Sequence, residues 1–180
     1  MIKNSVLSVI NNKKIIREDL FVDSNDLALK SSVKAKKEKS DCVVRAFMIG
    51  LDISYDKAHA WVKTKLKRQD KKGTYTRKYI NNILGKTKNH HKISLYGVTP
   101  KYRIGRFERS KILINKKYKK KTNYTVKSFM ENHPEGIYII IVRGHALCLK
   151  DGILYGNQCE QSQGFKRQIR YVLKISKINK

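Results

Sequence analysis

The sequence predicts an α+β fold in which N-terminal helices pack on a C-terminal antiparallel β-sheet. Two observations carry this prediction. Between residues 42 and 85, apolar residues recur at helical spacing, and each such segment follows a residue whose side chain can cap a helix. From residue 136 onward, short apolar runs are separated by turn residues, as in neighbouring strands of a sheet. Helices that precede the strands, rather than alternating with them, are typical of the α+β class.

The chain divides into two expected parts. Residues 1–40 are predicted to form an N-terminal extension, with a hairpin that turns at Asn11-Asn12. The stretch SSVKAKKEKS then has little to bury and is predicted to be a linker. Residues 41–180 are predicted to form the α+β domain, with a strongly basic insertion at about 61–121.

Three helices are expected in the first half of the domain. Each is preceded by a residue whose side chain can accept hydrogen bonds from the free backbone N–H groups of the first turn. The expected caps are Ser40 or Asp41, then Ser54, then Thr76, and Gly50 and Gly85 are expected to end the first and third helices.

The second half is predicted to be mainly β-structure. Two short strands, KISLYGV and KILIN, are expected among basic loops, and Thr125 is expected to cap a short helix through Met130. The runs GIYIIIV, GHALCLK and ILYGN then form successive strands, with a tight turn at Asp151-Gly152. In the last strand, residues Ile169, Tyr171, Leu173 and Ile175 are expected on one face.

The cysteines and histidines do not indicate a metal or a disulfide framework. Cys42, Cys148 and Cys159 have no CxxC spacing, and the five histidines are scattered, so no cofactor is expected. The chain has no signal-peptide pattern, and its longest apolar run, residues 136–142, is too short to cross a bilayer. We therefore expect a cytoplasmic or virion-associated protein that is not secreted and has no membrane partner.

Three residues are candidates for one chemical unit: Cys42, His145 and Asn157. Cys42 lies at an expected helix start, where free N–H groups and the helix dipole favour a thiolate. His145 is flanked by small residues at the start of a strand and is the best candidate for the base. Pairing through the Asp151-Gly152 turn brings Asn157 close to residue 145 or 146, where it can orient the imidazole. The alternative for Cys42 is a buried structural thiol.

These segments resemble the papain-like cysteine peptidase superfamily, most closely its small, divergent bacterial and phage branches, including bacteriocin-leader-type peptidases. The resemblance rests on DCVVRAF, SYDKAHAW, TVKSFMENHPEGIYIIIVRGHALCLKDG and ILYGN. It implies a papain-like fold and a phage-encoded thiol protease that cleaves peptide or isopeptide bonds of a protein substrate. It also implies Cys42 as nucleophile, His145 as acid and base, and Asn157 as the orienting residue.

One feature departs from the family pattern. The family usually carries a glutamine several residues before the cysteine, as a donor to the oxyanion, and here that stretch reads KAKKEKS. The Cys42 backbone, Ser40 or a lysine is then expected to supply the donor. Two alternatives remain: a catalytically inactive, nucleic-acid-associated structural or virion protein, and an acyltransferase or deamidase of the same fold. Gln158 is an alternative to Asn157.

The net charge of +27 predicts binding to nucleic acid or another polyanion without sequence specificity. Residues 61–121 hold 21 Lys and Arg but only two acidic residues, with aromatic residues between them that can stack on bases. An AT-rich genome would also enrich lysine, so part of the charge has a second explanation. The expected polyanion-binding residues are Lys67, Arg68, Lys71, Lys72, Arg77, Lys78, Lys101, Arg103, Arg106, Arg109, Lys116, Lys117, Lys119, Lys120 and Lys121.

The remaining histidines and cysteines have simpler expected roles. His59 lies between alanines on an expected helix and is predicted to be a packing residue. His90-His91 is expected in a polar basic loop, and Cys148 and Cys159 are expected to be core or incidental.

Overall fold

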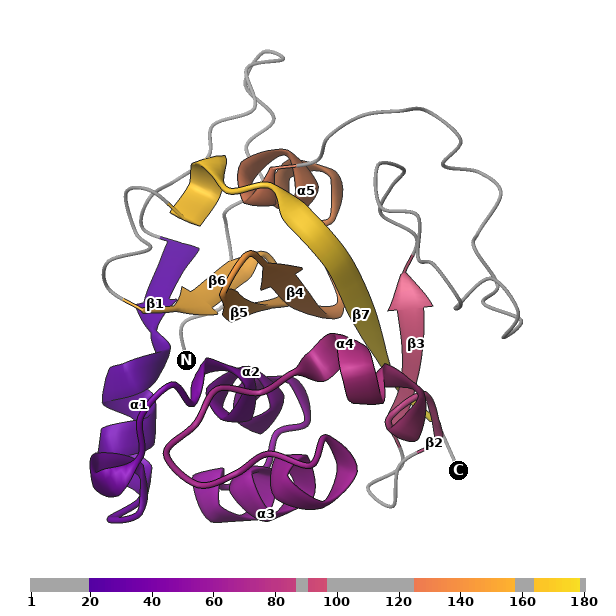
Figure 1. The fold of residues 1–180 in the computed structure, drawn as a ribbon. Helices are drawn as coiled ribbons and strands as arrows, with labels where there is room; N and C mark the ends of the chain where they lie inside the picture. The colour runs from indigo at the N-terminus through magenta and orange to yellow at the C-terminus, as the bar shows by residue number, and fades with distance from the viewer. Residues whose placement is uncertain (1–19, 87–90, 97–124, 158–163, 179–180) are drawn as a thin grey trace.

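A computed structural model describes residues 20–86, 91–96, 125–157 and 164–178. In these ranges one mixed sheet of seven strands lies between two helical layers (Figure 1). The strand order is β1-β6-β5-β4-β7-β3-β2, and every pairing is antiparallel except the parallel pair β1 and β6. The α+β prediction is confirmed at this level.

The described residues form seven strands, five α-helices and three short 3₁₀ turns. The strands are β1 (Phe21–Asp23), β2 (Gly85–Lys86), β3 (His91–Tyr96), β4 (Ile137–Val142), β5 (His145–Lys150), β6 (Ile153–Gly156) and β7 (Ile169–Lys177). The α-helices are α1 (Ser24–Ser31), α2 (Cys42–Gly50), α3 (Tyr55–Lys65), α4 (Thr76–Tyr79) and α5 (Val126–Asn132). Short 3₁₀ turns lie at η2 (Ala35–Lys37), η3 (Ile80–Asn82) and η6 (Gly164–Lys166).

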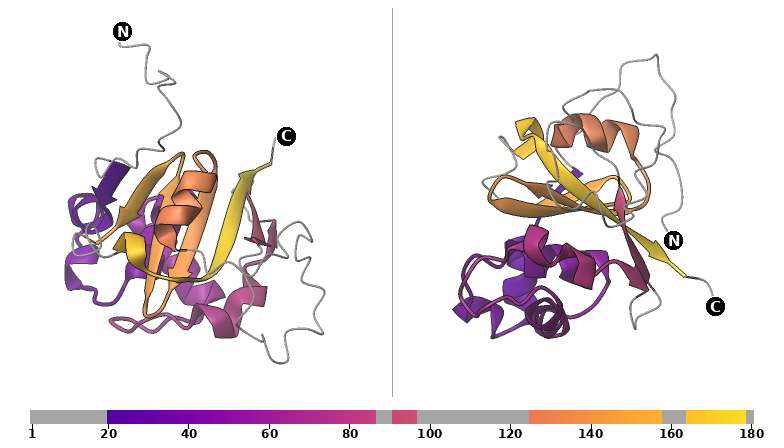
Figure 2. Two further views of the ribbon diagram at one scale, coloured as in Figure 1. Left: turned by 90° about the horizontal axis from the view of Figure 1, so that it is seen from above. Right: turned by 45° about the vertical axis from the view of Figure 1, so that its right-hand side comes forward.

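Both faces of the central strand β4 are buried. Figure 2 shows α5 on one side of the sheet and the helices of the first half on the other. Along β4, Ile137, Ile139 and Ile141 pack in the core beneath α2 and α3, whereas the alternate residues pack in the core beneath α5. A strand covered on both faces needs apolar residues at every position, which explains the unbroken run IYIIIV.

Two predicted helix caps are confirmed. The Ser54 side chain accepts a hydrogen bond from the Lys57 N–H, and Thr125 forms a reciprocal capping box with Ser128. Thr76 is not a cap, because Tyr75 holds the cap position of α4 and the Thr76 hydroxyl instead shares a hydrogen bond with the Tyr171 hydroxyl.

The predicted turn between β5 and β6 is also confirmed. Asp151 and Gly152 both have positive φ angles, 49° and 82°, as a tight hairpin turn requires. The Asp151 carboxylate accepts a hydrogen bond from the Gly136 N–H at 3.1 Å, so it links the turn to the residue that precedes β4. The turn fixes the register that pairs Lys150 with Ile153.

The predicted alternation in β7 is wrong at its first residue. Tyr171, Leu173 and Ile175 face the core beneath α2, but Ile169 belongs to the core beneath α5. The cause is a register shift opposite Ile141 and Val142, where β7 carries one extra residue. Ile169, which precedes this shift, therefore points to the opposite face of the sheet from Tyr171.

Residues 20–40 differ from the expected extension and linker. Strand β1 pairs with β6, α1 packs against α2, and the buried Ser24 hydroxyl donates to the Gly156 carbonyl oxygen at 2.9 Å. The expected basic insertion likewise begins inside the fold, because residues 61–86 and 91–96 form parts of α3, α4, β2 and β3. The predicted hairpin at Asn11-Asn12 and the predicted strand KILIN lie outside the described residues. None of the described helices has the length and apolar character needed to cross a membrane.

Candidate active site at the start of helix α2

Cys42 is the first residue of α2, as the sequence predicts, and the first turn of this helix has no side-chain cap. Asp41 holds the cap position, but its carboxylate accepts from the Tyr55 hydroxyl at 2.7 Å and pairs with Arg45 Nε at 3.0 Å. The helical hydrogen bonds begin with the Arg45 N–H, which donates to the Asp41 carbonyl oxygen at 3.1 Å. The N–H groups of residues 42–44 therefore have no carbonyl acceptor within the helix.

The Cys42 sulfur meets the start of strand β5. Burial raises the pKa of the Cys42 thiol above its ordinary value. Hydrogen bonds from the backbone of Ala146 and of Val43, together with the Arg45 charge, lower the pKa in part but do not cancel the effect of burial. Cys42 is thus a half-buried thiol that is protonated at neutral pH. Its sulfur contacts the backbone of Ala146, the residue that follows His145.

His145 opens strand β5 and is neutral at physiological pH. Its pKa is lowered to about 4, first by burial and then by the positive charges of Arg167 and Arg45. A neutral imidazole can accept a proton, so its charge state suits a general base.

Asn157 follows directly after β6, at the same end of the sheet. The register pairs Cys148 with Tyr155, and its continuation places Asn157 opposite Ala146, as predicted. Asn157 Oδ1 and His145 Nε2 are both buried and have no hydrogen-bond partner among the described residues. One atom is an acceptor and the other can carry a proton, so their hydrogen-bonding characters are complementary.

Arg45 is a charged residue of this site that the sequence analysis did not identify. It is 5% exposed, it pairs with Asp41, and its charge acts on both Cys42 and His145. Its Nη1 atom is buried without a hydrogen-bond partner in the described part of the chain. The available signal was the single charged residue inside the apolar run VVRAFMIG.

The other expected members of the site have different positions. Ser40 is exposed with φ of 53°, and it precedes the helix rather than opening it. Cys148 is fully buried in the core beneath α2, and burial raises the pKa of its thiol, which confirms its assignment to the core. Gln158 and Cys159 lie outside the described residues.

A second polar cluster lies between residues 38 and 71. His59 is completely buried, but its Nε2 atom lies 3.0 Å from Glu38 Oε1 and 3.1 Å from Arg68 Nη1. His59 is therefore part of an ion-pair network rather than a simple packing residue. Burial raises the pKa of Glu38, but hydrogen bonds from Arg68 and from the Lys71 backbone outweigh it and leave that pKa below its ordinary value.

This cluster does not fit a metal ion, although ligand atoms of Glu38, His59 and Asp70 lie within 4.8 Å of one another. The Arg68 guanidinium already contacts Glu38 Oε2 at 2.7 Å, and the Lys63 ammonium contacts both Asp70 oxygens, the nearer at 2.8 Å. Protein cations thus hold the anionic ligands that a metal would need.

The expected polyanion-binding residues divide into three groups. Lys67, Lys71, Lys72, Arg77 and Lys78 are exposed. The expectation for Arg68 is wrong, because its side chain is 0% exposed and is committed to Glu38. Lys101, Arg103, Arg106, Arg109, Lys116, Lys117, Lys119, Lys120 and Lys121 lie outside the described residues.

His91 also differs from its expected place in a polar loop, because it opens β3 and is buried there, whereas His90 lies outside the described residues.

Comparison of the chain with protein-family models, with curated proteins and with solved structures found no significant match.

Proposed function

We propose that the protein is a cysteine peptidase, a thiol hydrolase that cleaves peptide or isopeptide bonds with Cys42 as nucleophile. One observation carries this proposal. The uncapped first turn of α2 holds the Cys42 sulfur against strand β5, at the residue that follows a neutral His145. Acyl transfer needs a nucleophile, a base that accepts its proton and N–H groups that stabilise the oxyanion, and these three kinds of group occur together here.

The reaction proceeds through a thioester. As the Cys42 sulfur attacks the scissile carbonyl carbon, its proton passes to His145, and the carbonyl oxygen becomes an oxyanion. Collapse of this intermediate breaks the C–N bond, and His145 returns the proton to the leaving amine. Water then attacks the thioester, with His145 again as base, which releases the carboxylic acid and restores the thiol.

The first turn of α2 stabilises the oxyanion. The Cys42 N–H has no carbonyl acceptor within the helix, the Val43 N–H bonds only the Cys42 sulfur among the described residues, and Asp41 is held away from both by Tyr55 and Arg45. These donors replace the side-chain amide that the sequence lacks before the cysteine.

Asn157 orients the imidazole in this proposal. His145 Nε2 and Asn157 Oδ1 are both buried, and neither has a hydrogen-bond partner among the described residues. A hydrogen bond between them on substrate binding would fix the tautomer in which the other ring nitrogen faces the thiol.

The test is cleavage of a mixed peptide library, followed by mass spectrometry of newly formed amino termini. We expect wild type and Cys148→Ala to yield the same cleavage sites, because Cys148 is a core thiol. Cys42→Ala is expected to yield none, and His145→Ala to lower the rate by at least ~100-fold. Cleavage that survives Cys42→Ala, or a wild-type protein that releases no new termini, would contradict the proposal.

A further inference from the structure

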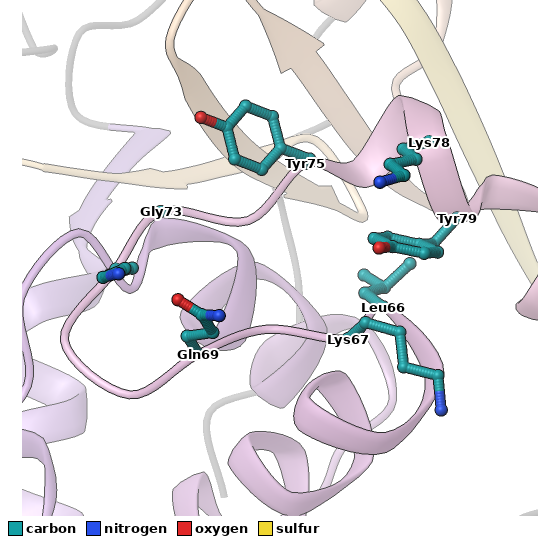
Figure 3. A pocket seen from close by; sticks show the side chains of 8 residues that line it. Leu66, Lys67, Gln69, Gly73, Tyr75, Lys78 and Tyr79 are labelled. Carbon is teal, nitrogen blue, oxygen red and sulfur yellow. The ribbon is translucent and has the colours of Figure 1, made fainter.

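A pocket of about 180 Å³ lies where the loop after α3 meets α4, and Figure 3 shows its side chains. The chemistry of its lining is distinctive, because three lysines and two tyrosines surround it and none of its eight lining residues is acidic. The lining residues are Leu66, Lys67, Gln69, Lys72, Gly73, Tyr75, Lys78 and Tyr79.

The loop that forms one wall of this pocket is anchored from beneath. Arg68 is buried and donates to Glu38 Oε2 at 2.7 Å and to the Lys39 carbonyl oxygen at 3.1 Å. The Lys71 N–H donates to the same Glu38 oxygen at 2.8 Å. Because Arg68 and Lys71 are held in this way, the residues beside them, Lys67, Gln69 and Lys72, have a fixed backbone from which their side chains reach the pocket.

The aromatic residues of the pocket are accessible. Tyr75 is 80% exposed, far more than a tyrosine that serves only the core, and no apolar neighbour in the described residues covers it. Tyr79 is half-buried, and the Lys78 ammonium lies 5.3 Å from the centre of its ring. In Figure 3 the Tyr79 ring lies between Lys78 and Leu66.

We propose that this pocket binds one nucleotide of a single-stranded nucleic acid. The exposed Tyr75 ring, which points away from Tyr79 and Leu66 in Figure 3, offers a stacking surface for the base at the rim of the pocket. The three lysines neutralise the flanking phosphates, and the Gln69 amide can bond to a base edge. Without an acidic residue in the lining, nothing there repels a phosphate.

The cost of unpairing a base favours a single strand over a duplex at this site. A base in a duplex is stacked and paired and enters a pocket only when it is flipped out, which costs energy that a single strand does not pay. A carboxylate-rich peptide would meet the same lysines but has no flat ring for Tyr75. None of the lining residues belongs to the proposed active site, and the inference does not rest on peptidase activity.

The test is fluorescence anisotropy of a labelled oligothymidylate titrated with the full-length protein at several salt concentrations. We expect Tyr75→Ala to weaken binding about 5- to 100-fold and Tyr75→Phe to bind within about twofold of wild type, because stacking needs only the ring. Replacing Lys67, Lys72 and Lys78 together with glutamine should reduce the slope of log K against log salt by about 2.

A matched triple replacement separates the pocket from the general charge of the molecule. Lys36, Lys57 and Lys127 are also exposed, so their change to glutamine removes the same charge from elsewhere on the surface. We expect this variant and Cys42→Ala to bind like wild type. Equal weakening by both triple variants, no effect of Tyr75→Ala, or equal affinity for duplex DNA or for polyglutamate would each overturn the proposal.

Discussion

Burial shifts the pKa of Cys42 upward and that of His145 downward, so both groups are neutral near pH 7. In the proposed mechanism the thiol therefore loses its proton to His145 as it attacks, rather than existing beforehand as a thiolate. The Arg45 charge lowers the pKa of both groups, so it opposes the effect of burial at Cys42 and adds to the effect of burial at His145.

The pKa of His145 predicts a dependence of stability on pH. The folded state binds a proton at His145 only near pH 4, whereas the unfolded chain does so near the ordinary value of 6.5. The unfolded state therefore binds more protons between these values, and His145 should lower the free energy of unfolding by up to about 3 kcal/mol as the pH falls from 6.5 to 4.

Urea denaturation of wild type and His145→Gln at pH 7, 6, 5 and 4 measures this effect. The variant keeps a polar side chain but has no proton to gain, so its stability should fall less across this range. Identical slopes for the two proteins would show that the imidazole is not buried as described.

At the scale of elements, the position of helix α2 is set by the close packing of its C-terminal end against the sheet. A Cβ atom on Gly50 would lie 2.8 Å from the Cδ1 atoms of Ile139 and Ile175, so α2 ends on the sheet at a distance that only glycine allows without rearrangement. The position of Cys42 at the other end of this helix depends on the same packing.

We expect Gly50→Val to lower the free energy of unfolding by about 1–3 kcal/mol, because it overpacks this contact. Gly73→Val is the matched control, since a Cβ at Gly73 meets no atom within 4 Å, and it should change stability by less than about 0.5 kcal/mol. Thermal or urea unfolding of both variants distinguishes the sites, and a neutral Gly50→Val would mean that the helix does not pack this closely.

At the scale of the whole molecule, the features predicted from the sequence are those that local patterns encode. The Thr125 cap, the Asp151-Gly152 turn and the continuous run of β4 each depend on neighbours within a few residues. The position of Cys42 at a helix start belongs to the same group.

The features that the sequence did not reveal depend on partners far along the chain. Strand β1 has three residues and is defined by β6, more than 130 positions away, and Ile169 changes face because of a bulge opposite β4. The Tyr55 hydroxyl, which helps to divert Asp41 from capping, is brought to Asp41 by the tertiary fold, whereas Arg45 lies one turn along the same helix. Local pattern suggests a cap at Asp41, whereas the structure leaves that helix start uncapped.

The central claim is that Cys42 and His145 act as one chemical unit, and the alkylation rate of Cys42 as a function of pH tests it most directly. Mass spectrometry follows Cys42 in the folded wild type and in His145→Ala, with buried Cys148 as the internal reference. The account predicts a rise in Cys42 reactivity near pH 4, where the imidazole becomes able to accept a proton, and its loss in the variant. Superimposable profiles for the two proteins, with reactivity only at alkaline pH, would contradict it.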